Sequence, residues 1–478
     1  MDPAATHPEA AVDAIRRKLG PAGWIDDTSE MAAYVIDWSR RFGGEAVGIA
    51  RPSSTEEVAA VVRAAATAGF GIVPQGGNTG LCGGSVPIAG SGKPVLILSL
   101  QRMNRVRAID PVDYTVTAEA GCVLETLQKF AAEHGRYFPL SLAAEGSCTI
   151  GGNLSTNAGG TNVLKYGNAR ELALGLEVVL PDGEIWDGLR SLRKDNRGYD
   201  LKDLFIGAEG TLGVITAAVL RLFPLPRAIA AALVAVKSPE AALLLLDRAR
   251  AASRDSVETF ELLPRETLEL VLRHIPGIQE PMPEISPFYV LLELVSTADG
   301  DGETGELLEG LLASAFEEGI ATDAVVAKSE AQRNALWRIR ESIPEAGRVE
   351  GPSITHDVSV PVSKVPEFYR AALSAIGKAA PGARAFGFGH LGDGNLHFSI
   401  RPAPGEDPQI LIEREAEVSA PLFELLERMN GSFSAEHGIG QRKVGQLVRS
   451  KSAVEMRLMR SIKDALDPLG IMNPGKVL

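Results

Sequence analysis

The sequence has little cysteine and no long apolar run. Its 478 residues include 3 cysteines, Cys82, Cys122 and Cys148, which are too few and too scattered for a disulfide framework or an iron–sulfur cluster. Each is expected to be a small buried hydrophobe. No segment approaches the roughly 18 apolar residues that a membrane helix requires, and residues 1–14 lack the apolar stretch of a secretory signal. These absences predict a cytoplasmic protein with reduced thiols.

Basic residues are also fewer than acidic ones. The chain has 48 Lys+Arg against 61 Asp+Glu, a formal net charge of -13. This balance argues against nucleic acid as a partner, because phosphates select basic surfaces. An acidic protein gives an anionic substrate no long-range attraction, so such a substrate must meet positive groups within its site.

The length and composition are those of a folded protein with several domains. Hydrophobic residues make up 45% and charged residues 23%, which is typical of globular chains, and the length exceeds what one hydrophobic core usually serves. The predicted parts are an N-terminal helical segment (1–41), a glycine-rich α+β domain (42–226), a domain with an antiparallel sheet covered by helices (227–425) and a C-terminal helical segment (426–478).

Hydrophobic patterning predicts the elements of these domains. Thr55 is a plausible N-cap for a helix that ends near Ala68. Strands are predicted at 95–98, 106–109, 114–118, 176–180, 214–222, 231–236 and 288–294, and helices at 239–252 and 304–318.

Glycine, by contrast, is plentiful and clusters in three segments, residues 74–81, 146–160 and 207–215. Glycine allows positive φ and lets backbone N–H groups converge on an anion. The first segment alone fits a pyrophosphate cradle and a tight surface loop equally well. The second interleaves hydroxyls, amides and bare backbone, which suits a planar polar ring and a phosphate chain.

These segments resemble the FAD-binding domain of the vanillyl-alcohol-oxidase/p-cresol-methylhydroxylase flavoproteins. The resemblance implies a two-lobed FAD-binding domain and a separate substrate (cap) domain. Some relatives attach FAD through a histidine in these loops, and none is present here, so noncovalent FAD is expected. The implied FAD contacts are Pro74, Gly76, Gly77, Asn78, Thr79, Gly80, Leu81, Gly146, Ser147, Thr149, Gly152, Asn153, Asn157, Gly159, Gly160, Glu209, Gly213, Ile215 and Asn473.

A second constellation lies in the last hundred residues. His390 and His397 flank Gly-Asp-Gly-Asn, which is turn chemistry between two strand-like runs. A hairpin would bring the two imidazoles together, whereas their odd spacing on one strand would point them to opposite faces. Glu436 and His437 follow in Ser-Ala-Glu-His-Gly-Ile-Gly. A lone histidine is more often a hydrogen-bonded core residue, but two imidazoles and a carboxylate together favour a site for Zn²⁺, with Mn²⁺ or Fe²⁺ as alternatives.

Such a metal suits the oxidation of a 2-hydroxy acid. It can hold the substrate's carboxylate and hydroxyl and acidify the hydroxyl, while His437 takes the hydroxyl proton and the α-hydrogen leaves as hydride to flavin N5. These motifs and the terminal Asn-Pro-Gly-Lys resemble the D-2-hydroxyglutarate and D-lactate dehydrogenase branch of the same flavoproteins. The resemblance makes His390, His397 and Glu436 the metal ligands, His437 the base and Arg340 a substrate contact, and it brings Asn473 and Lys476 over the flavin.

The sequence indicates the identity of the substrate less clearly than the type of reaction. In 2-hydroxyglutarate enzymes of this branch we expect a lysine where Thr355 stands, a small hydroxylated residue in place of Pro344 and an amide in place of Ser399. D-2-hydroxyglutarate is therefore favoured only slightly over D-lactate or D-mandelate.

Two further functions compete with this prediction. They are a His₂Glu zinc hydrolase and an oxidase that passes electrons to O₂. Since the sequence has no haem or iron–sulfur motif, a separate electron acceptor is expected, either an electron-transfer flavoprotein or a quinone. A homodimer is left open.

Overall fold

The computed structural model describes residues 8–298 and 301–478, which form two units. Unit 1 contains the chain up to Gly159, then Gly167–Pro224 and Glu436–Leu478. Unit 2 contains Gly160–Tyr166 and Leu225–Ala435. The predicted N-terminal segment thus belongs to unit 1, and so does the predicted C-terminal segment from Glu436 onward. Residues 1–7 of the predicted N-terminal helical segment lie outside the described residues.

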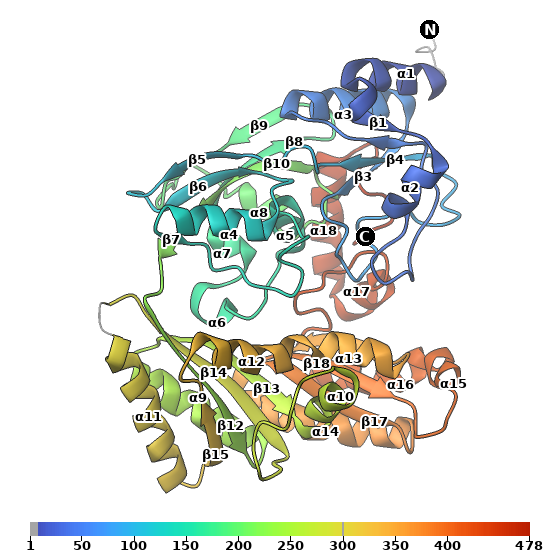
Figure 1. Cartoon of the computed structure of the whole chain (residues 1–478). Coiled ribbons are helices and arrows are strands. Elements are labelled where there is room, and N and C mark those ends of the chain that lie inside the picture. Colours follow the sequence, from blue (N-terminus) through green and yellow to red (C-terminus); the bar gives the residue numbers. More distant parts are fainter. Residues whose placement is uncertain (1–7, 299–300) are drawn as a thin grey trace. The chain divides into compact units, whose positions relative to one another are not determined.

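The first sheet of unit 1 is four-stranded, in the order β1-β2-β4-β3. Strands β2, β4 and β3 run parallel, and β1 pairs antiparallel with β2. Apolar side chains of α1 and α3 pack against this sheet with Ile72, Leu96 and Leu98 (Figure 1). The elements are α1 (Pro8–Leu19), a 3₁₀ turn (Pro21–Gly23), β1 (Trp24–Ile25), α2 (Thr28–Val35), β2 (Ile49–Ala50), α3 (Thr55–Ala68), β3 (Gly71–Gln75) and β4 (Val95–Ser99).

The second sheet of unit 1 is antiparallel, in the order β5-β6-β10-β8-β9. A short pair, β7 and β11, lies apart from it. The elements are β5 (Val106–Asp110), β6 (Thr115–Glu119), α4 (Leu124–Glu133), β7 (Arg136–Tyr137), α5 (Ile150–Thr156), α7 (Ala169–Leu172), β8 (Ala173–Val179), β9 (Ile185–Gly188), α8 (Lys202–Phe205), β10 (Val214–Arg221) and β11 (Phe223–Pro224).

The C-terminal part of unit 1 has two helices, α17 (Val444–Ser450) and α18 (Ala453–Leu466). After them the chain returns to the first sheet. The Ile72 N–H donates to the carbonyl of Ile471 (2.7 Å), and the Asn473 N–H donates to the carbonyl of Ile72 (2.8 Å). This added bridge beside β3 fixes Asn473 next to the glycine segment that follows β3.

Unit 2 is built on a seven-stranded antiparallel sheet, in the order β15-β12-β14-β13-β17-β18-β16. It confirms the sheet predicted for this region. The elements are α6 (Val163–Tyr166), β12 (Ala228–Val236), α9 (Pro239–Ser253), β13 (Val257–Pro264), α10 (Arg265–His274), β14 (Phe288–Ser296), α11 (Asp301–Glu317), β15 (Ala321–Val326), α12 (Glu330–Glu341), α13 (Ile343–Glu350), β16 (Ile354–Ser359), a 3₁₀ turn (Val362–Lys364), α14 (Val365–Ala379), β17 (Arg384–His390), β18 (Asn395–Arg401), α15 (Pro408–Glu413) and α16 (Glu415–Arg428).

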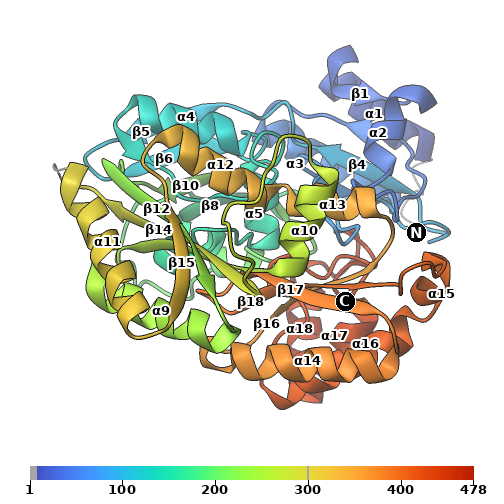
Figure 2. The same cartoon turned by 60° about the horizontal axis from the view of Figure 1, so that its bottom comes forward.

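Helices cover both faces of this sheet (Figure 2). Because side chains alternate along a strand, Val234, Leu262 and Leu292 pack on one face with α9, α11, α14 and α16. Leu233 and Leu263 pack on the opposite face with α10, α12 and α13. The second face also carries polar residues, and it positions the candidate metal site described below.

One local expectation needs correction. Ser54, not Thr55, is the N-cap of α3, since its hydroxyl accepts from the N–H of Glu57. The Thr55 hydroxyl instead donates to Glu177 (2.6 Å). The C-terminal fifty residues also contain more loop than predicted, because α17 and α18 leave the stretches before and after them non-helical.

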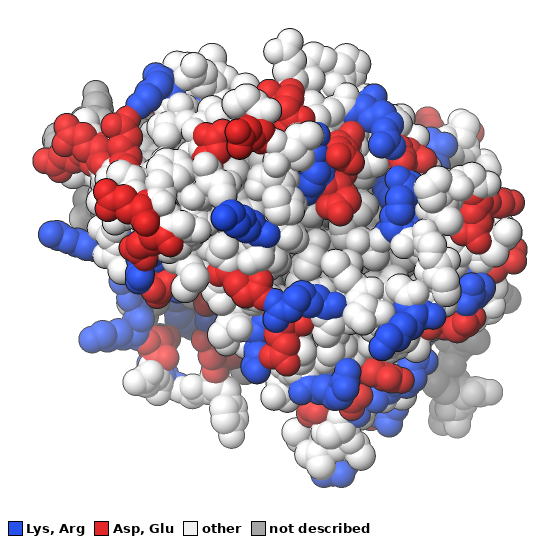
Figure 3. All heavy atoms as spheres, turned by 90° about the horizontal axis from the view of Figure 1, so that it is seen from below, with Lys and Arg blue, Asp and Glu red and all other residues white. Residues whose placement is uncertain are grey.

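The thiol expectation fits the structure, and charges of both signs are mixed on one face of the surface. Figure 3 shows basic and acidic side chains interspersed on the face it draws, with no field of one sign. All three cysteines are buried free thiols, and burial raises the pKa of both Cys122 and Cys148 to about 11. Within the described ranges, none of the helices has the length and apolar character needed to cross a membrane.

Candidate active site

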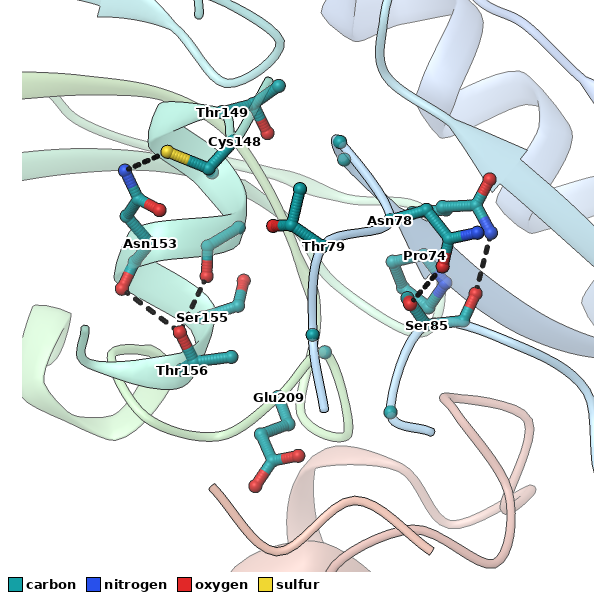
Figure 4. A pocket seen from close by; sticks show the side chains of 18 of the residues that line it. Pro74, Asn78, Thr79, Ser85, Cys148, Thr149, Asn153, Ser155, Thr156 and Glu209 are labelled. Atoms are coloured by element: carbon teal, nitrogen blue, oxygen red, sulfur yellow. Dashed lines mark hydrogen bonds between the residues drawn. The ribbon is translucent and has the colours of Figure 1, made fainter. Parts of the chain in front are cut away.

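The glycine segments of unit 1 surround a pocket (Figure 4). Residues 74–80 form one wall, α5 and the residues before it form another, and residues 209–215 close a third side. The predicted FAD contacts that line it are Pro74, Gly76, Gly77, Asn78, Thr79, Gly80, Thr149, Gly152, Asn153, Glu209, Gly213 and Ile215. Lysine and arginine are not among the described lining residues, so an anion in this pocket would be held by backbone N–H groups and hydroxyls.

Close backbone approach explains the glycines of this loop. A Cβ at Gly77 would lie 2.0 Å from the carbonyl oxygen of Ser147, and one at Gly76 would lie 2.2 Å from Oγ1 of Thr149. The loop is also tied from outside, because Asn78 Nδ2 donates to the carbonyl of Ile36 (2.8 Å). Among the described residues, Oγ1 of Thr149 is buried with no hydrogen-bond partner, which suits a polar ligand.

Several predicted FAD contacts do not line this pocket. They are Leu81, Gly146, Ser147, Asn157, Gly159, Gly160 and Asn473. Asn473 is 1% exposed, and its Nδ2 donates to the carbonyls of Gly84 (2.9 Å) and Glu209 (2.7 Å). It therefore joins two lining segments from behind. Lys476 is also buried, and burial lowers its pKa to about 8.

The pocket also contains residues outside the predicted set. They are Gln75, Cys82, Gly84, Ser85, Leu100, Cys148, Gly151, Ser155, Thr156, Gly210, Val214 and His437. Most of them lie between predicted contacts in the sequence, so their position within the glycine segments could have identified them as lining residues. His437, predicted as the base, is distant in sequence from every glycine segment, and folding brings it to this pocket.

In unit 2, a row of polar side chains crosses neighbouring strands on the face that carries α10, α12 and α13. It begins with Glu261 on β13, which is fully buried and is the register partner of His390 on β17. Nδ1 of His390 is hydrogen-bonded to the Glu261 carboxylate. Burial acts to raise the pKa of Glu261, but Arg340 and His390 outweigh it and hold that pKa well below its ordinary value. An ionised Glu261 accepts from Nδ1–H, so Nε2 is the ring nitrogen through which His390 could bind a metal.

Arg340, predicted as a substrate contact, lies on α12 and is 8% exposed. Its Nε donates to Glu261, and its guanidinium carbon lies 5.1 Å from the centroid of the Phe388 ring. One strand over, Glu293 on β14 accepts from Trp337 Nε1 (2.7 Å) and Nη2 of Arg333 (2.9 Å). Residues 333, 337 and 340 share one helix face, so α12 neutralises both buried carboxylates.

The row continues to β18 and β16. The predicted hairpin is confirmed, since β17 and β18 pair antiparallel with Phe388 opposite His397. The rings of His390 and His397 are 5.3 Å apart. His397 is also the register partner of Asp357, whose Oδ1 lies 3.7 Å from Nδ1 of His397. Asp357 was not predicted as a site residue. The sequence pair His356-Asp357 could have indicated it, but this pair is far along the chain from the histidine motif.

Asp357 is buried and bonded on both sides. Oδ1 accepts from Asn395 Nδ2 (2.9 Å), and Oδ2 accepts from the N–H of Ala435 (3.0 Å). Asp357 and His397 offer candidate ligand atoms within 4.8 Å of one another, and so do the neighbours Glu436 and His437. Ala435 is the last residue of unit 2 and Glu436 resumes unit 1, so one peptide bond joins the two pairs.

The remaining predicted substrate residues are neighbours. Thr355 on β16 is the register partner of Ser399 on β18, which lies two residues after His397 and on the same face of the sheet. Ser399 is buried, and its Oγ has no hydrogen-bond partner among the described residues. Pro344 stands in the first turn of α13.

Comparison with known proteins identifies the fold and the family of this chain. The family described as "FAD linked oxidases, C-terminal domain" matches residues 225–477, and the family described as "FAD binding domain" matches residues 46–188. The crystal structure of p-cresol methylhydroxylase has the same fold, with a TM-score of 0.76 at 17% identity, over 98% of this chain and 96% of that one. The predicted fold class is thereby confirmed.

Curated relatives extend over nearly the whole chain. The mitochondrial D-2-hydroxyglutarate dehydrogenase of Arabidopsis thaliana is 38% identical, covering 96% of this chain and 80% of that protein. The D-2-hydroxyglutarate dehydrogenase of Xanthomonas citri pv. viticola is 40% identical, covering 100% of this chain and 97% of that protein.

The predicted cytoplasmic location is wrong by this comparison. The relatives from Arabidopsis thaliana, Bos taurus and Danio rerio are named mitochondrial enzymes. Excluding a secretory signal did not bear on this, since transit peptides are amphipathic rather than continuously apolar. With both family matches and these relatives in hand, the chain belongs to the FAD-dependent D-2-hydroxyacid dehydrogenases, within the FAD linked oxidases.

Proposed function

We propose that this enzyme oxidises its D-2-hydroxy acid with the help of a divalent metal held by His390, His397 and Glu436, and that His437 is the base. The observation that carries the proposal is the pairing of each imidazole with a carboxylate across the sheet. Glu261 is bonded to Nδ1 of His390, and Asp357 lies 3.7 Å from Nδ1 of His397. Carboxylates placed behind metal-binding histidines fix the tautomer and orient Nε2 toward the ion.

Chain continuity supports Glu436 as the third ligand. The Ala435 N–H donates to Asp357, and successive Cα atoms are about 3.8 Å apart. Glu436 therefore directly follows a residue whose backbone N–H is bonded to Asp357. Two imidazoles and a carboxylate suit Zn²⁺ and leave coordination positions for a substrate, with Mn²⁺ or Fe²⁺ as alternatives. Asp357 is the competing carboxylate, and its two hydrogen bonds favour a supporting role.

FAD is proposed to bind in the pocket of unit 1, which His437 also lines. When bound, FAD accepts two electrons and a divalent metal acidifies the coordinated hydroxyl. An imidazole nitrogen of His437 then receives the hydroxyl proton. Hydroxyls and backbone N–H groups of the lining can hold the phosphates without a side-chain cation, which supports this assignment.

The substrate side chain is proposed to extend along β18 toward Thr355 and Ser399. D-2-hydroxyglutarate is the first substrate to test because the relatives carry that name. D-lactate and D-mandelate are the second candidates. The unpartnered Ser399 hydroxyl opposite Thr355 offers neutral hydrogen bonds rather than a cation.

A zinc hydrolase and an O₂-using oxidase are the two competing functions. The hydrolase loses its support, since the family is FAD-linked. The oxidase would be distinguished by peroxide formation in air. A separate electron acceptor, an electron-transfer flavoprotein or a quinone, completes the proposed cycle.

The test is anaerobic reduction of the purified holoenzyme. Each of the three D-2-hydroxy acids is mixed with the protein while the visible absorbance of the flavin is followed. The same mixture is repeated after chelator treatment and after Zn²⁺ or Mn²⁺ is restored. Bleaching by one substrate that stops on chelation and returns with metal supports the proposal. Bleaching that survives complete metal removal would contradict the metal's role.

A further inference from the structure

Glu209 joins three segments around the FAD pocket. Its N–H donates to the carbonyl of Ser155 on α5 (2.8 Å), and its carbonyl accepts from Asn473 Nδ2 (2.7 Å). Its carboxylate accepts from two backbone amides of the third segment, Oε1 from the N–H of Ile439 (2.6 Å) and Oε2 from that of Gly440 (2.8 Å). Figure 4 shows this side chain directed away from Thr79 and toward the C-terminal segment.

The segment that Glu209 holds is the one that carries His437. Ile439 follows His437 by two residues. Because successive Cα atoms are about 3.8 Å apart, holding Ile439 in place limits how far His437 can move. Gly438, between them, has φ +73°, and a Cβ there would lie 2.8 Å from Oε1 of Glu209. The glycine after His437 is thus required both by its left-handed backbone and by the carboxylate that packs against it.

We infer that Glu209 is the positioning residue of this active site, holding His437 at the FAD pocket. The inference rests on the proposed function of His437 as base. A carboxylate that accepts two backbone N–H bonds, one on each oxygen, is a more directional tie than apolar contacts. Burial raises the pKa of this group. A half-buried glutamate can lose these bonds to water without unfolding unit 1, so the expected damage is to geometry.

Glu209→Gln is the variant that tests this. Glutamine keeps the shape and one acceptor oxygen, but its NH₂ group faces one of the two N–H donors. With FAD bound as in wild type, kcat should fall about 10- to 100-fold, because small misplacements of a catalytic group have such effects. KM should change by less than about threefold, since substrate binding is left largely intact.

Asp37→Asn is the matched control. Asp37 is 1% exposed, and its carboxylate also accepts from two backbone amides, those of Arg41 and Phe42 (both 3.0 Å). It lies in unit 1 outside the segment of His437. A kcat within about twofold of wild type is expected for this variant.

A second measurement does not depend on catalysis. Hydrogen exchange of the Ile439 and Gly440 amides should accelerate in Glu209→Gln and stay unchanged in Asp37→Asn. Two results would overturn the inference and leave the proposed function standing. One is unchanged exchange in Glu209→Gln, and the other is an unchanged kcat in Glu209→Gln when the separate variant His437→Ala has lost turnover. Failure of every D-2-hydroxy acid to reduce the wild-type flavin would instead refute the proposed function, and the exchange data alone would then decide whether Glu209 holds the segment.

Discussion

The Glu261 carboxylate is hydrogen-bonded to Nδ1 of His390 across two neighbouring strands, at a point where the two residues are register partners. Arg340 bonds the same carboxylate from α12 above the sheet. The buried negative charge is therefore balanced and shared, and the imidazole is held in one tautomer. This places the electrostatic support of the candidate metal site in the sheet itself.

Glu261→Gln should weaken metal binding about 10- to 100-fold, because a neutral amide orients and polarises the imidazole less than a carboxylate does. FAD content should stay at the wild-type level, since Glu261 belongs to the other unit. Metal stoichiometry after dialysis against graded chelator is the measurement. Glu293→Gln is the control, because it also removes a buried charge facing α12. Equal metal loss in both variants would contradict the specific role of Glu261.

His437→Ala should retain FAD and metal yet lose at least about 100-fold in kcat, the usual contribution of a general base. The measurement is the rate of anaerobic flavin reduction by the accepted D-2-hydroxy acid. His134→Ala is the matched control, since this histidine is exposed at the end of α4 and its ring is hydrogen-bonded to the local carbonyl of Phe130. Unimpaired flavin reduction in His437→Ala would refute the base assignment.

Gly77→Ala should abolish FAD binding, because its Cβ would lie 2.0 Å from the Ser147 carbonyl and force the two loops apart. Gly146→Ala is the comparison. Its nearest new contact would be 3.6 Å, to Glu125, and it does not line the pocket. Flavin content per purified chain, read from visible absorbance, is the measurement. Flavin loss in Gly146→Ala with retention in Gly77→Ala would contradict the assignment of this pocket to FAD.

Thr355→Lys should raise the preference for D-2-hydroxyglutarate over D-lactate at least tenfold in kcat/KM. A hydrogen bond to a charged group contributes about 1.5–3 kcal/mol, and the new ammonium would lie beside Ser399 and His397 on adjacent strands. Thr355→Met separates the effect of charge from that of bulk. An unchanged ratio of the two kcat/KM values in Thr355→Lys would remove Thr355 from the substrate subsite.

Stability should fall as pH rises from about 5 to about 8. Burial, reinforced by Glu293, raises the pKa of Glu258 from 4.5 to about 7 against the opposing effects of Lys165, Tyr166 and Arg333. Between these values the folded state holds a proton that the unfolded state has released, so its stabilising contribution is present at low pH and is lost as pH approaches 7. The loss is up to about 3 kcal/mol.

Thermal unfolding of Glu258→Gln and of the exposed-site control Glu56→Gln, compared at several pH values, checks this. Glu258→Gln should flatten the decline of the unfolding temperature with pH, because glutamine has no proton to lose. Glu56→Gln should follow wild type. A wild-type unfolding temperature that rises over this window would contradict the assignment.

Local chemistry made much of this protein predictable. The turn residues between His390 and His397 lie next to two alternating runs, so the hairpin and the approach of the two rings follow from neighbouring residues alone. The glycine segments were equally legible, since positive φ and close approach leave few other residue choices. The antiparallel sheet of unit 2 followed from strand-length apolar runs separated by helical ones.

Tertiary structure alone decided which residues support these motifs. Glu261 lies 129 residues from His390, and Asp357 meets His397 only because β16 pairs with β18 at the edge of the sheet. Arg340, predicted as a substrate contact, is bonded through its Nε to Glu261. Glu209 reaches the segment after His437 across 230 residues. Such partners depend on strand order and helix placement, which the whole chain's packing determines, so no local pattern in the sequence records them.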